Sequence, residues 1–266
     1  MNLISRHVGR ILADYLSRKV GGYLPFAVIS EEALRATLVP GDILLVEGNQ
    51  HVSVAIKYLT QSTWSHAVMY VGDALAPEDA GPDAPRFIEA DLRNGVVGRP
   101  FSHYAGLNSR ICRAPGLTPE HRGRVVNFLV ERLGMTYDLK NVVDLLRYML
   151  PKPAVPPRWR RRMLALGSGD PTRAICSTLI AQAFQTVGYP ILPIVVRPGH
   201  RPRMRRRHHT LYTPRDFDLS PYFQVVKPTL ERGFDYRHIQ WEDNPDYQEA
   251  APEPEREAPE GAVIPG

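Results

Sequence analysis

The chain has 266 residues, of which 43% are hydrophobic and 23% are charged. These ordinary globular proportions exclude a fully disordered chain and allow one substantial domain with extensions. No run of about 18 apolar residues occurs, which argues against a membrane-spanning helix. The sequence holds only two cysteines, too few for a disulfide framework, so a reducing compartment is expected.

The net charge of +5 hides an uneven distribution. Residues 242–266 carry eight acidic side chains against Arg256 alone and are rich in proline, so we expect a disordered acidic tail there. The rest of the chain is strongly basic. It is either attracted to phosphates, anionic lipid or RNA, or it has a solvated basic surface.

Residues 1–37 are predicted to form an N-terminal amphipathic helix and a linker. Apolar residues recur at helical spacing from Leu3 to Leu16. Arg10 and Asp14 interrupt the place where a secretory signal would have its apolar centre. The helix either packs on the domain or lies on a membrane surface. We therefore expect a cytoplasmic protein, with the inner face of an anionic membrane as the alternative location.

The central part of the chain alternates short apolar runs with turns. Pro40–Asp42 is a turn signal, and His51–Thr63 is typical of a short helix or loop. Strands are predicted near residues 43, 67, 88, 96 and 111. These runs predict a small antiparallel sheet.

Helical patterns follow the predicted strands. Thr118 is placed to cap a helix in which Pro119 is the first residue and which ends near Gly134. Further helices are predicted over residues 138–150 and 174–187. The fold class is therefore α+β, with the sheet packed against helices in one domain over residues 38–241. A Pro/Arg-rich insertion lies at about residues 151–173, and a second basic segment follows at residues 197–209.

Cys176 is the first candidate for chemistry because it stands where a loop gives way to an apolar helix. The positive end of the helix dipole lowers the pKa of a thiol there and favours the nucleophilic thiolate. The unpaired N–H groups of the same turn can stabilise an oxyanion. The alternative is a structural cysteine that fills the core.

A thiolate needs a base and a third group that orients the base. His66 begins the clearest predicted strand, and Glu89 lies on the next predicted strand. Adjacent strands bring opposed side chains to about 5 Å, so Glu89 can hold the imidazole ring. Asp91 is the alternative orienting group.

Five short motifs in one order resemble the permuted NlpC/P60-type cysteine hydrolases. This group includes the YiiX/YaeF-like amidases and the lecithin:retinol acyltransferase-like enzymes. The motifs are PGDIL at residues 40–44, SHAVMYVGD at 65–73, FIEA at 87–90, GMTYD at 134–138 and ICSTLI at 175–180. The histidine and the acidic residue precede the cysteine, as in the permuted group and unlike papain. The resemblance spans about residues 38–223.

The resemblance implies a circularly permuted papain-like fold with Cys176 as nucleophile, His66 as general base and Glu89 as the orienting group. It also implies a position for Tyr137 near the thiol, where it shapes the substrate site. No cofactor or metal is implied. The insertion between Tyr137 and Cys176 and the basic segment at 197–209 depart from the group's pattern and leave the substrate open.

Other reactive residues have less support. Cys112 sits within a predicted strand and is interpreted as structural, whereas His51 and His103 are alternative bases in predicted loops. The pair His208–His209 lacks metal-ligand spacing. The arginine clusters have few interleaved aromatic residues, so no specific nucleic-acid binding is expected. Their attraction to anionic lipid or to the acidic tail is the alternative.

These observations predict a cysteine-dependent hydrolase of the amidase or peptidase type. It would cleave an amide or ester in a small amide, peptide or lipid-like substrate through a thioester. One alternative is a lipid-directed acyltransferase or lipase, which the amphipathic N-terminus and the basic body favour. The other is a binding module without catalysis on the same fold.

Overall fold

The computed structural model describes residues 18–23, 25, 28–91, 94–136, 175–197 and 203–239. The chain divides into two compact units, Met1–Arg232 and Gly233–Gly266. Several predicted segments lie outside the described residues, namely the N-terminal helix, the helix over 138–150, the insertion at 151–173 and the acidic tail at 242–266. The domain boundaries drawn from the sequence stay predictions.

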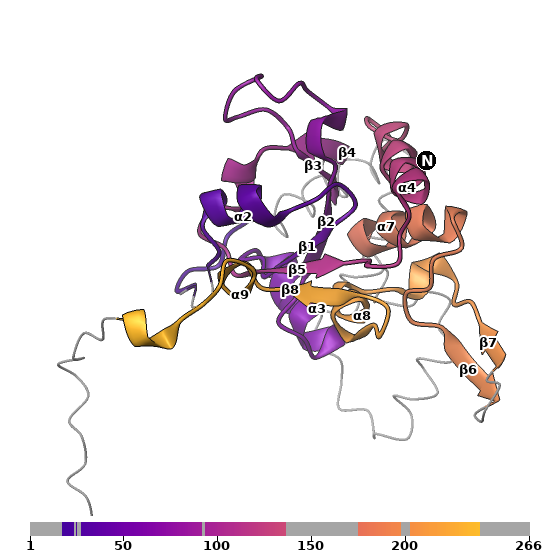
Figure 1. The fold of residues 1–266 in the computed structure, drawn as a ribbon. Helices are drawn as coiled ribbons and strands as arrows, with labels where there is room; N and C mark the ends of the chain where they lie inside the picture. The colour runs from indigo at the N-terminus through magenta and orange to yellow at the C-terminus, as the bar shows by residue number, and fades with distance from the viewer. Residues whose placement is uncertain are drawn as a thin grey trace, which may run out of the picture. The chain divides into compact units, whose positions relative to one another are not determined.

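A six-stranded antiparallel sheet forms the centre of the first unit (Figure 1). Its strand order is β4-β3-β2-β1-β5-β8, and all neighbouring strands are antiparallel. The strands are β1 (Ile43–Val46), β2 (His66–Tyr70), β3 (Phe87–Asp91), β4 (Gly95–Arg99), β5 (Ser109–Arg113) and β8 (Gln224–Val226). The five predicted strands are confirmed, and β8 is an addition that the sequence pattern did not indicate.

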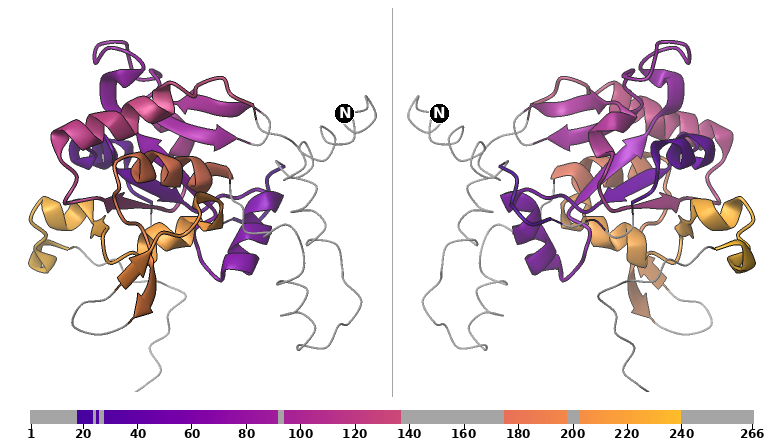
Figure 2. Two further views of the ribbon diagram at one scale, coloured as in Figure 1. Left: turned by 90° about the vertical axis from the view of Figure 1, so that its right-hand side faces the viewer. Right: turned by 90° about the vertical axis from the view of Figure 1, so that its left-hand side faces the viewer.

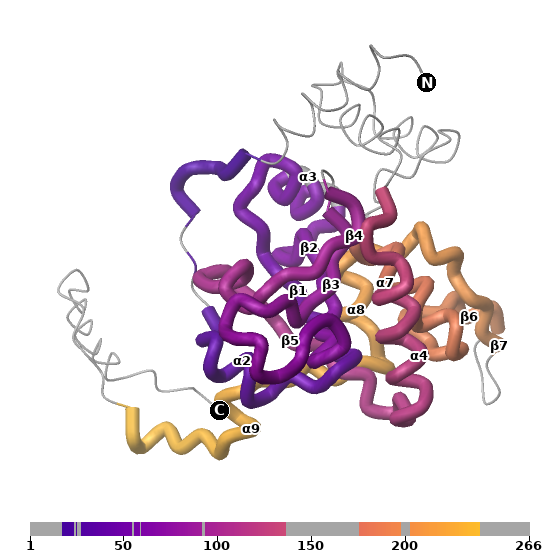
Figure 3. Tube along the Cα trace, turned by 90° about the horizontal axis from the view of Figure 1, so that it is seen from above, coloured from indigo at the N-terminus to yellow at the C-terminus, as the bar shows by residue number. Residues whose placement is uncertain are grey.

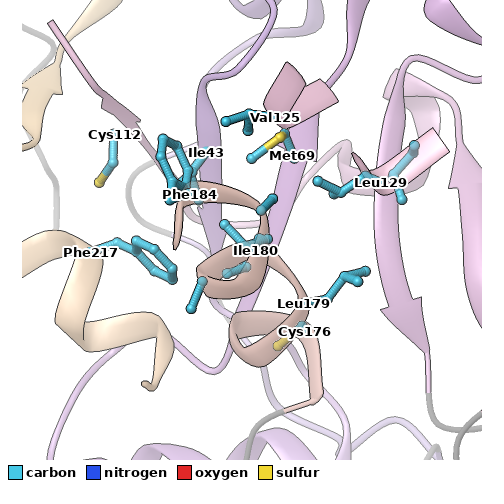
Figure 4. Packing of buried hydrophobic residues seen from close by; sticks show 14 of the residues in the cluster. Ile43, Met69, Cys112, Val125, Leu129, Cys176, Leu179, Ile180, Phe184 and Phe217 are labelled. Carbon is cyan, nitrogen blue, oxygen red and sulfur yellow. The ribbon is translucent and has the colours of Figure 1, made fainter. Parts of the chain in front are cut away.

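One face of the sheet is covered by α4 (Pro119–Val130) and α7 (Ile175–Thr186), which lie side by side in Figure 3. Alternate residues of each strand point to opposite faces. Met69 and Ile88 therefore face α7 and pack in one cluster with Ile180 and Phe184. Figure 4 shows Cys176 at one end of α7 and Phe184 at the other end, near Ile43.

The opposite face of the sheet packs against α2 (Glu31–Thr37) and the 3₁₀ turn η2 (Phe101–Tyr104). The ring of Phe87 on β3 makes edge-to-face contacts with Phe101 and Tyr104, at ring-centroid distances of 4.9 and 5.1 Å. Such contacts add to the hydrophobic stabilisation from burial. They also fix η2 beside β3, which matters for the site described below. The predicted α+β class, with an antiparallel sheet packed against helices, is thus confirmed.

Local signals explain where several helices begin. The side chain of Thr118 accepts a hydrogen bond from the His121 N–H, and Pro119 is the first residue of α4, as predicted. Residues 51–60 form the helix α3 (His51–Thr60). The remaining helical elements of the first unit are η1 (Gly72–Ala74), η3 (His209–Leu211), α8 (Pro214–Leu219) and α9 (Pro228–Glu231).

A second, two-stranded sheet projects from this body (Figures 1 and 2). It pairs β6 (Ile194–Arg197) with β7 (Arg203–Arg205), with an irregularity between Val195 and Arg197. The sequence indicated a basic segment over residues 197–209, which includes β7, and no strand for either β6 or β7. In the second unit, the side chain of Asp235 caps a short 3₁₀ turn, η4 (Tyr236–His238). Within the described residues no helix has the length and apolar character needed to cross a bilayer.

Candidate active site

The start of β2, the end of β3 and the start of α7 meet at one end of the sheet. β2 and β3 pair only at Met69 with Ile88 and at Tyr70 with Phe87. Toward His66, β2 is no longer paired with β3. It stays paired with β1 on its other side, where Val46 lies opposite His66. Helix α7 packs against both β2 and β3. The interrupted ladder therefore leaves the backbone of β2 accessible to the first turn of the helix.

Cys176 is the second residue of α7 and is buried, with 5% of its surface exposed. The thiol interacts with the ring of His66, with the backbone N–H of Ala67 and with the hydroxyl of Ser177, whose Oγ lies 3.9 Å from Sγ. Burial alone raises the pKa of the thiol, because it disfavours the charged form. The positive charge of His66 and these hydrogen bonds outweigh burial, and the net pKa of Cys176 is lowered.

His66 lies between the thiol and a carboxylate. Its Nε2 atom is 2.7 Å from Oε2 of Glu89, so Nδ1 is the ring nitrogen left for Cys176. Burial lowers the pKa of the imidazole, whereas the charge of Cys176, its hydrogen bond and the contact with Glu89 raise it. The net pKa of His66 lies well above its ordinary value of 6.5. The two shifts together favour a thiolate–imidazolium pair.

Glu89 is 4% exposed and is held by three side chains. Besides His66, the guanidinium Nε of Arg99 donates to Oε1 at 2.7 Å, and the hydroxyl of Tyr104 donates to Oε2 at 2.9 Å. Burial raises the pKa of this carboxyl, but the hydrogen bond with His66 and the charges of His66 and Arg99 bring it well below its usual range. Glu89 is therefore ionised at neutral pH and fully hydrogen-bonded, which fixes its position.

Arg99 and Tyr104 are the functional candidates that the sequence reasoning missed. Arg99 carried a usable signal, because β3 and β4 form a strand–turn–strand pair in which Val97 lies opposite Glu89. Arg99 is two residues further along and so lies on the same face as Glu89. Tyr104 carried no such signal, since it reaches Glu89 only through the packing of η2 on Phe87.

None of the other predicted candidates is among the described partners of the Cys176 thiol. Asp91, the alternative orienting group, accepts hydrogen bonds from Arg99 and Asn94. His51 is the first residue of α3. His103 has its Nε2 atom 3.8 Å from Oε1 of Glu89, and its pKa is lowered, chiefly by burial.

Cys112 and Tyr137 complete the sequence-derived set. Cys112 is completely buried in β5, and burial raises its pKa to about 12. Tyr137 lies just outside the described residues. Its neighbours Gly134–Thr136 run along β4, where the carbonyl of Met135 accepts a hydrogen bond from Val96. A Cβ at Gly95 would lie 2.1 Å from that carbonyl, so this close approach requires glycine.

A polar cleft of about 550 Å³ opens at the same end of the sheet. Arg110 of β5 lines it and lies opposite Leu45, which itself lies opposite Ala67. Neighbouring strands are about 4.8 Å apart, so the backbones of Ala67 and Arg110 are separated by about 10 Å. The indole of Trp64 lies under the Arg110 guanidinium and donates to Asp218. Over the described part of the chain, no group of three or more His, Cys, Asp or Glu side chains is placed to hold a metal ion.

Comparison with known proteins gives one distant relative. No family model matches the chain. Over 175 residues the chain is 21% identical to the probable lipoprotein peptidase YaeF of Escherichia coli strain K12. The match covers 60% of this chain and 60% of that protein, so the chain spans only part of the relative's length. The chain is therefore distantly similar to a probable peptidase.

Proposed function

We propose that the protein is a cysteine-dependent hydrolase of the amidase or peptidase type, with Cys176, His66 and Glu89 as its catalytic group. The observation that carries the proposal is the continuous contact from thiol to imidazole to carboxylate. A nucleophile, a base and an orienting acid in this sequence of contacts are the parts that acyl transfer requires. The distant similarity to a probable lipoprotein peptidase supports the same reaction class.

In the first half of the reaction, the thiolate of Cys176 attacks the carbonyl carbon of an amide or ester. A C–S bond forms, and the carbonyl electron pair moves to oxygen. N–H groups in the first turn of α7, which have no acceptor within the helix itself, stabilise that oxyanion. As the C–N or C–O bond breaks, the His66 imidazolium gives its proton to the leaving amine or alcohol, and a thioester is left on Cys176.

In the second half, a water molecule attacks the thioester while His66 takes a proton from that water. The C–S bond then breaks, the acid leaves, and the thiolate–imidazolium pair is restored. Glu89 does not exchange a proton in either half. It holds the ring with Nε2 toward the carboxylate and stabilises the imidazolium charge. The polar cleft beside Arg110 is where we place the part of the substrate that flanks the scissile bond.

For the fold, we propose a circularly permuted papain-like arrangement. In chain order, His66 and Glu89 on two neighbouring strands precede Cys176 at the start of the helix. Papain-type chains run from cysteine to histidine, so the order here is the permuted one. The antiparallel sheet with α7 packed across β2 and β3 is compatible with this arrangement.

The proposal is tested with p-nitrophenyl acetate, which acylates activated thiolates without further recognition. The full chain should release a burst of about one equivalent of p-nitrophenolate, and peptide mapping should find the acetyl group on Cys176. Cys176→Ser should abolish the burst, and Cys112→Ser should keep it. His66→Ala should slow acetylation by about 10²-fold or more, because general base catalysis contributes about 10²–10⁴.

The contradicting outcomes are specific. An acetyl group found on Cys112, or a burst that is equally fast in His66→Ala, would remove the assigned roles. A Cys176 that is acetylated no faster than free cysteine would favour the binding module without catalysis.

A further inference from the structure

Within the described residues, the two-stranded sheet β6–β7 leaves several apolar side chains about half exposed. Val195, Val196 and Met204 are each 51–52% exposed, and Ile194 is 40% exposed. All seven strand residues of this sheet are exposed. In the six-stranded sheet most aliphatic side chains are buried. An isolated pair of strands gains little stability in water, so a contiguous exposed apolar ribbon indicates a surface that meets another phase or partner.

Cationic side chains surround these apolar residues. Arg197, Arg203 and Arg205 belong to the two strands, and Arg206 follows directly. All four are exposed. Among the residues that the structure describes, none of these guanidinium groups lies within ion-pair distance of a carboxylate, whereas Arg207 pairs with Asp216 at 3.1 Å. Within the described residues, the sheet thus carries four positive charges without an ion-pair partner beside its apolar side chains.

The base of this sheet is fixed to the body. The side-chain amide of Gln185, on α7, donates to the carbonyl of Arg207 at 2.9 Å, and the hydroxyl of Tyr222 contacts the sulfur of Met204 at 3.4 Å. Figures 1 and 2 show the two strands extending from there away from the six-stranded sheet. A fixed base and a free, projecting ribbon allow the side chains of β6 and β7 to meet a flat surface.

One kind of partner satisfies both properties at once. The surface of an anionic bilayer offers negative headgroups to arginines and, a few ångströms deeper, an apolar region to valine, isoleucine and methionine. A nucleic acid offers phosphates, but it gives these aliphatic side chains no apolar surface, and β6–β7 carries no aromatic residue on which a base could stack. The combination therefore favours lipid over RNA.

We propose that β6–β7 docks the protein on an anionic membrane surface, with Val195 and Met204 entering the interface and the surrounding arginines binding lipid headgroups. Val195 and Met204 are cross-strand partners and share a face of the ribbon. Arg203 and Arg205 alternate with Met204 along β7, so their long side chains start from the other face and bind headgroups around the edge of the ribbon. This proposal is independent of the cysteine chemistry. It also assigns membrane contact to a different part of the chain from the N-terminal segment that the sequence pattern indicated.

The test is sedimentation of the full chain with vesicles of equal parts phosphatidylglycerol and phosphatidylcholine at about 0.1 M salt, with phosphatidylcholine vesicles alone as the neutral reference. Binding should require the anionic lipid and weaken as salt screens the charges. Val195→Asn/Met204→Gln should lower partitioning at least tenfold. Arg203→Gln/Arg205→Gln should lower it by more than tenfold, since each arginine near such a surface contributes about fivefold.

Matched controls come from the same unit. Leu219 and Leu230 are 54% and 58% exposed, so Leu219→Gln/Leu230→Gln removes equally exposed apolar surface elsewhere. Lys227→Gln/Arg232→Gln removes two exposed charges elsewhere. Neither control should change partitioning more than twofold. Val195→Trp should also gain a blue-shifted emission that brominated lipid quenches, which reports entry into the interface and not mere proximity.

Three outcomes would overturn the proposal. The first is that Val195→Asn/Met204→Gln and Arg203→Gln/Arg205→Gln bind vesicles as strongly as the unaltered chain does. The second is that deleting residues 1–17 abolishes binding while these two double variants retain it. The third is that the unaltered chain does not bind anionic vesicles but binds single-stranded RNA, and that Arg203→Gln/Arg205→Gln weakens this binding, which would identify a nucleic-acid surface.

Discussion

The Nε2 atom of His66 lies 2.7 Å from Oε2 of Glu89, and that carboxylate is also bound by Arg99 and Tyr104. Two strands supply the histidine and the glutamate, and a third element, α7, supplies the thiol. The imidazole is therefore held from one side by a buried, ionised carboxylate while its other side meets Cys176.

Removing the charge of Glu89 should weaken the thiolate–imidazolium pair. In Glu89→Gln the imidazolium loses its charge-assisted hydrogen bond, so the pKa of His66 falls and the pKa of Cys176 rises. A charge-assisted bond is worth about 1.5–3 kcal/mol, so acetylation of Cys176 at pH 7 should slow about 10- to 100-fold. Asp91→Asn on the same strand is the matched control and should stay within about threefold. An equal loss in both variants would contradict the role of Glu89.

The pH dependence should differ between ester and anilide substrates. Reactivity rises with pH as Cys176 ionises, and that rise should be centred below the ordinary thiol value because the pKa of Cys176 is lowered. An anilide also needs the proton of the imidazolium, so its rate should fall again above the raised pKa of His66. The apparent pKa values of the two limbs describe the coupled Cys176–His66 pair and not either residue alone. Rate profiles from pH 5 to 10 should give a bell for the anilide and a plateau for the ester; a plateau for both would exclude His66 as the acid.

Tyr104 should act through Glu89. Tyr104→Phe removes one donor from the buried carboxylate of Glu89, so we expect a loss of about 1–3 kcal/mol in the free energy of unfolding. We also expect the rising limb of the pH–rate profile, which reports the ionisation of Cys176, to move to higher pH. The control is Tyr70→Phe, because Tyr70 belongs to the same aromatic cluster through Phe87 and Phe101. That control should leave the pH profile in place. A purely structural Tyr104 would change the unfolding midpoint and not the profile.

Cys112 should be inert. It is fully buried and its pKa is raised to about 12, so iodoacetamide should not modify it in the folded chain below about pH 9. Cys112→Ser puts a hydroxyl into an apolar site and should cost about 1–3 kcal/mol in urea unfolding, with acetylation of Cys176 unchanged. Peptide mapping of both cysteines checks this. Equal labelling of the two would show that burial does not separate them.

The sequence predicted the strands that are buried on both faces. Ile43–Val46 and His66–Tyr70 are continuous runs of β-favouring residues, and such runs are visible without tertiary information. β8 spans three residues and owes its strand conformation to pairing with β5, for instance Val226 opposite Ile111. β6 and β7 span only four and three residues, and they owe their strand conformation to pairing with each other. In both cases the pairing partner, and not the local residue pattern, decides the strand.

The candidate site divides in the same way. His66 and Glu89 became candidates because each begins or lies within a predicted strand, and Cys176 because a helix starts beside it. The hydroxyl of Tyr104 reaches Glu89 only because η2 packs on Phe87, a contact between elements that local sequence does not encode. The contact between Tyr104 and Glu89 could therefore be recognised only in the structure.

The ion pair between Cys176 and His66 is best tested by the pH dependence of Cys176 alkylation by iodoacetamide. The measurement uses the Cys112→Ser background, with and without His66→Ala. We expect a thiol pKa well below the value of about 8.5 for free cysteine, which returns toward 8.5 when the imidazole is removed. A pKa at or above about 8.5 that does not respond to His66→Ala would contradict the pairing and the proposed chemistry.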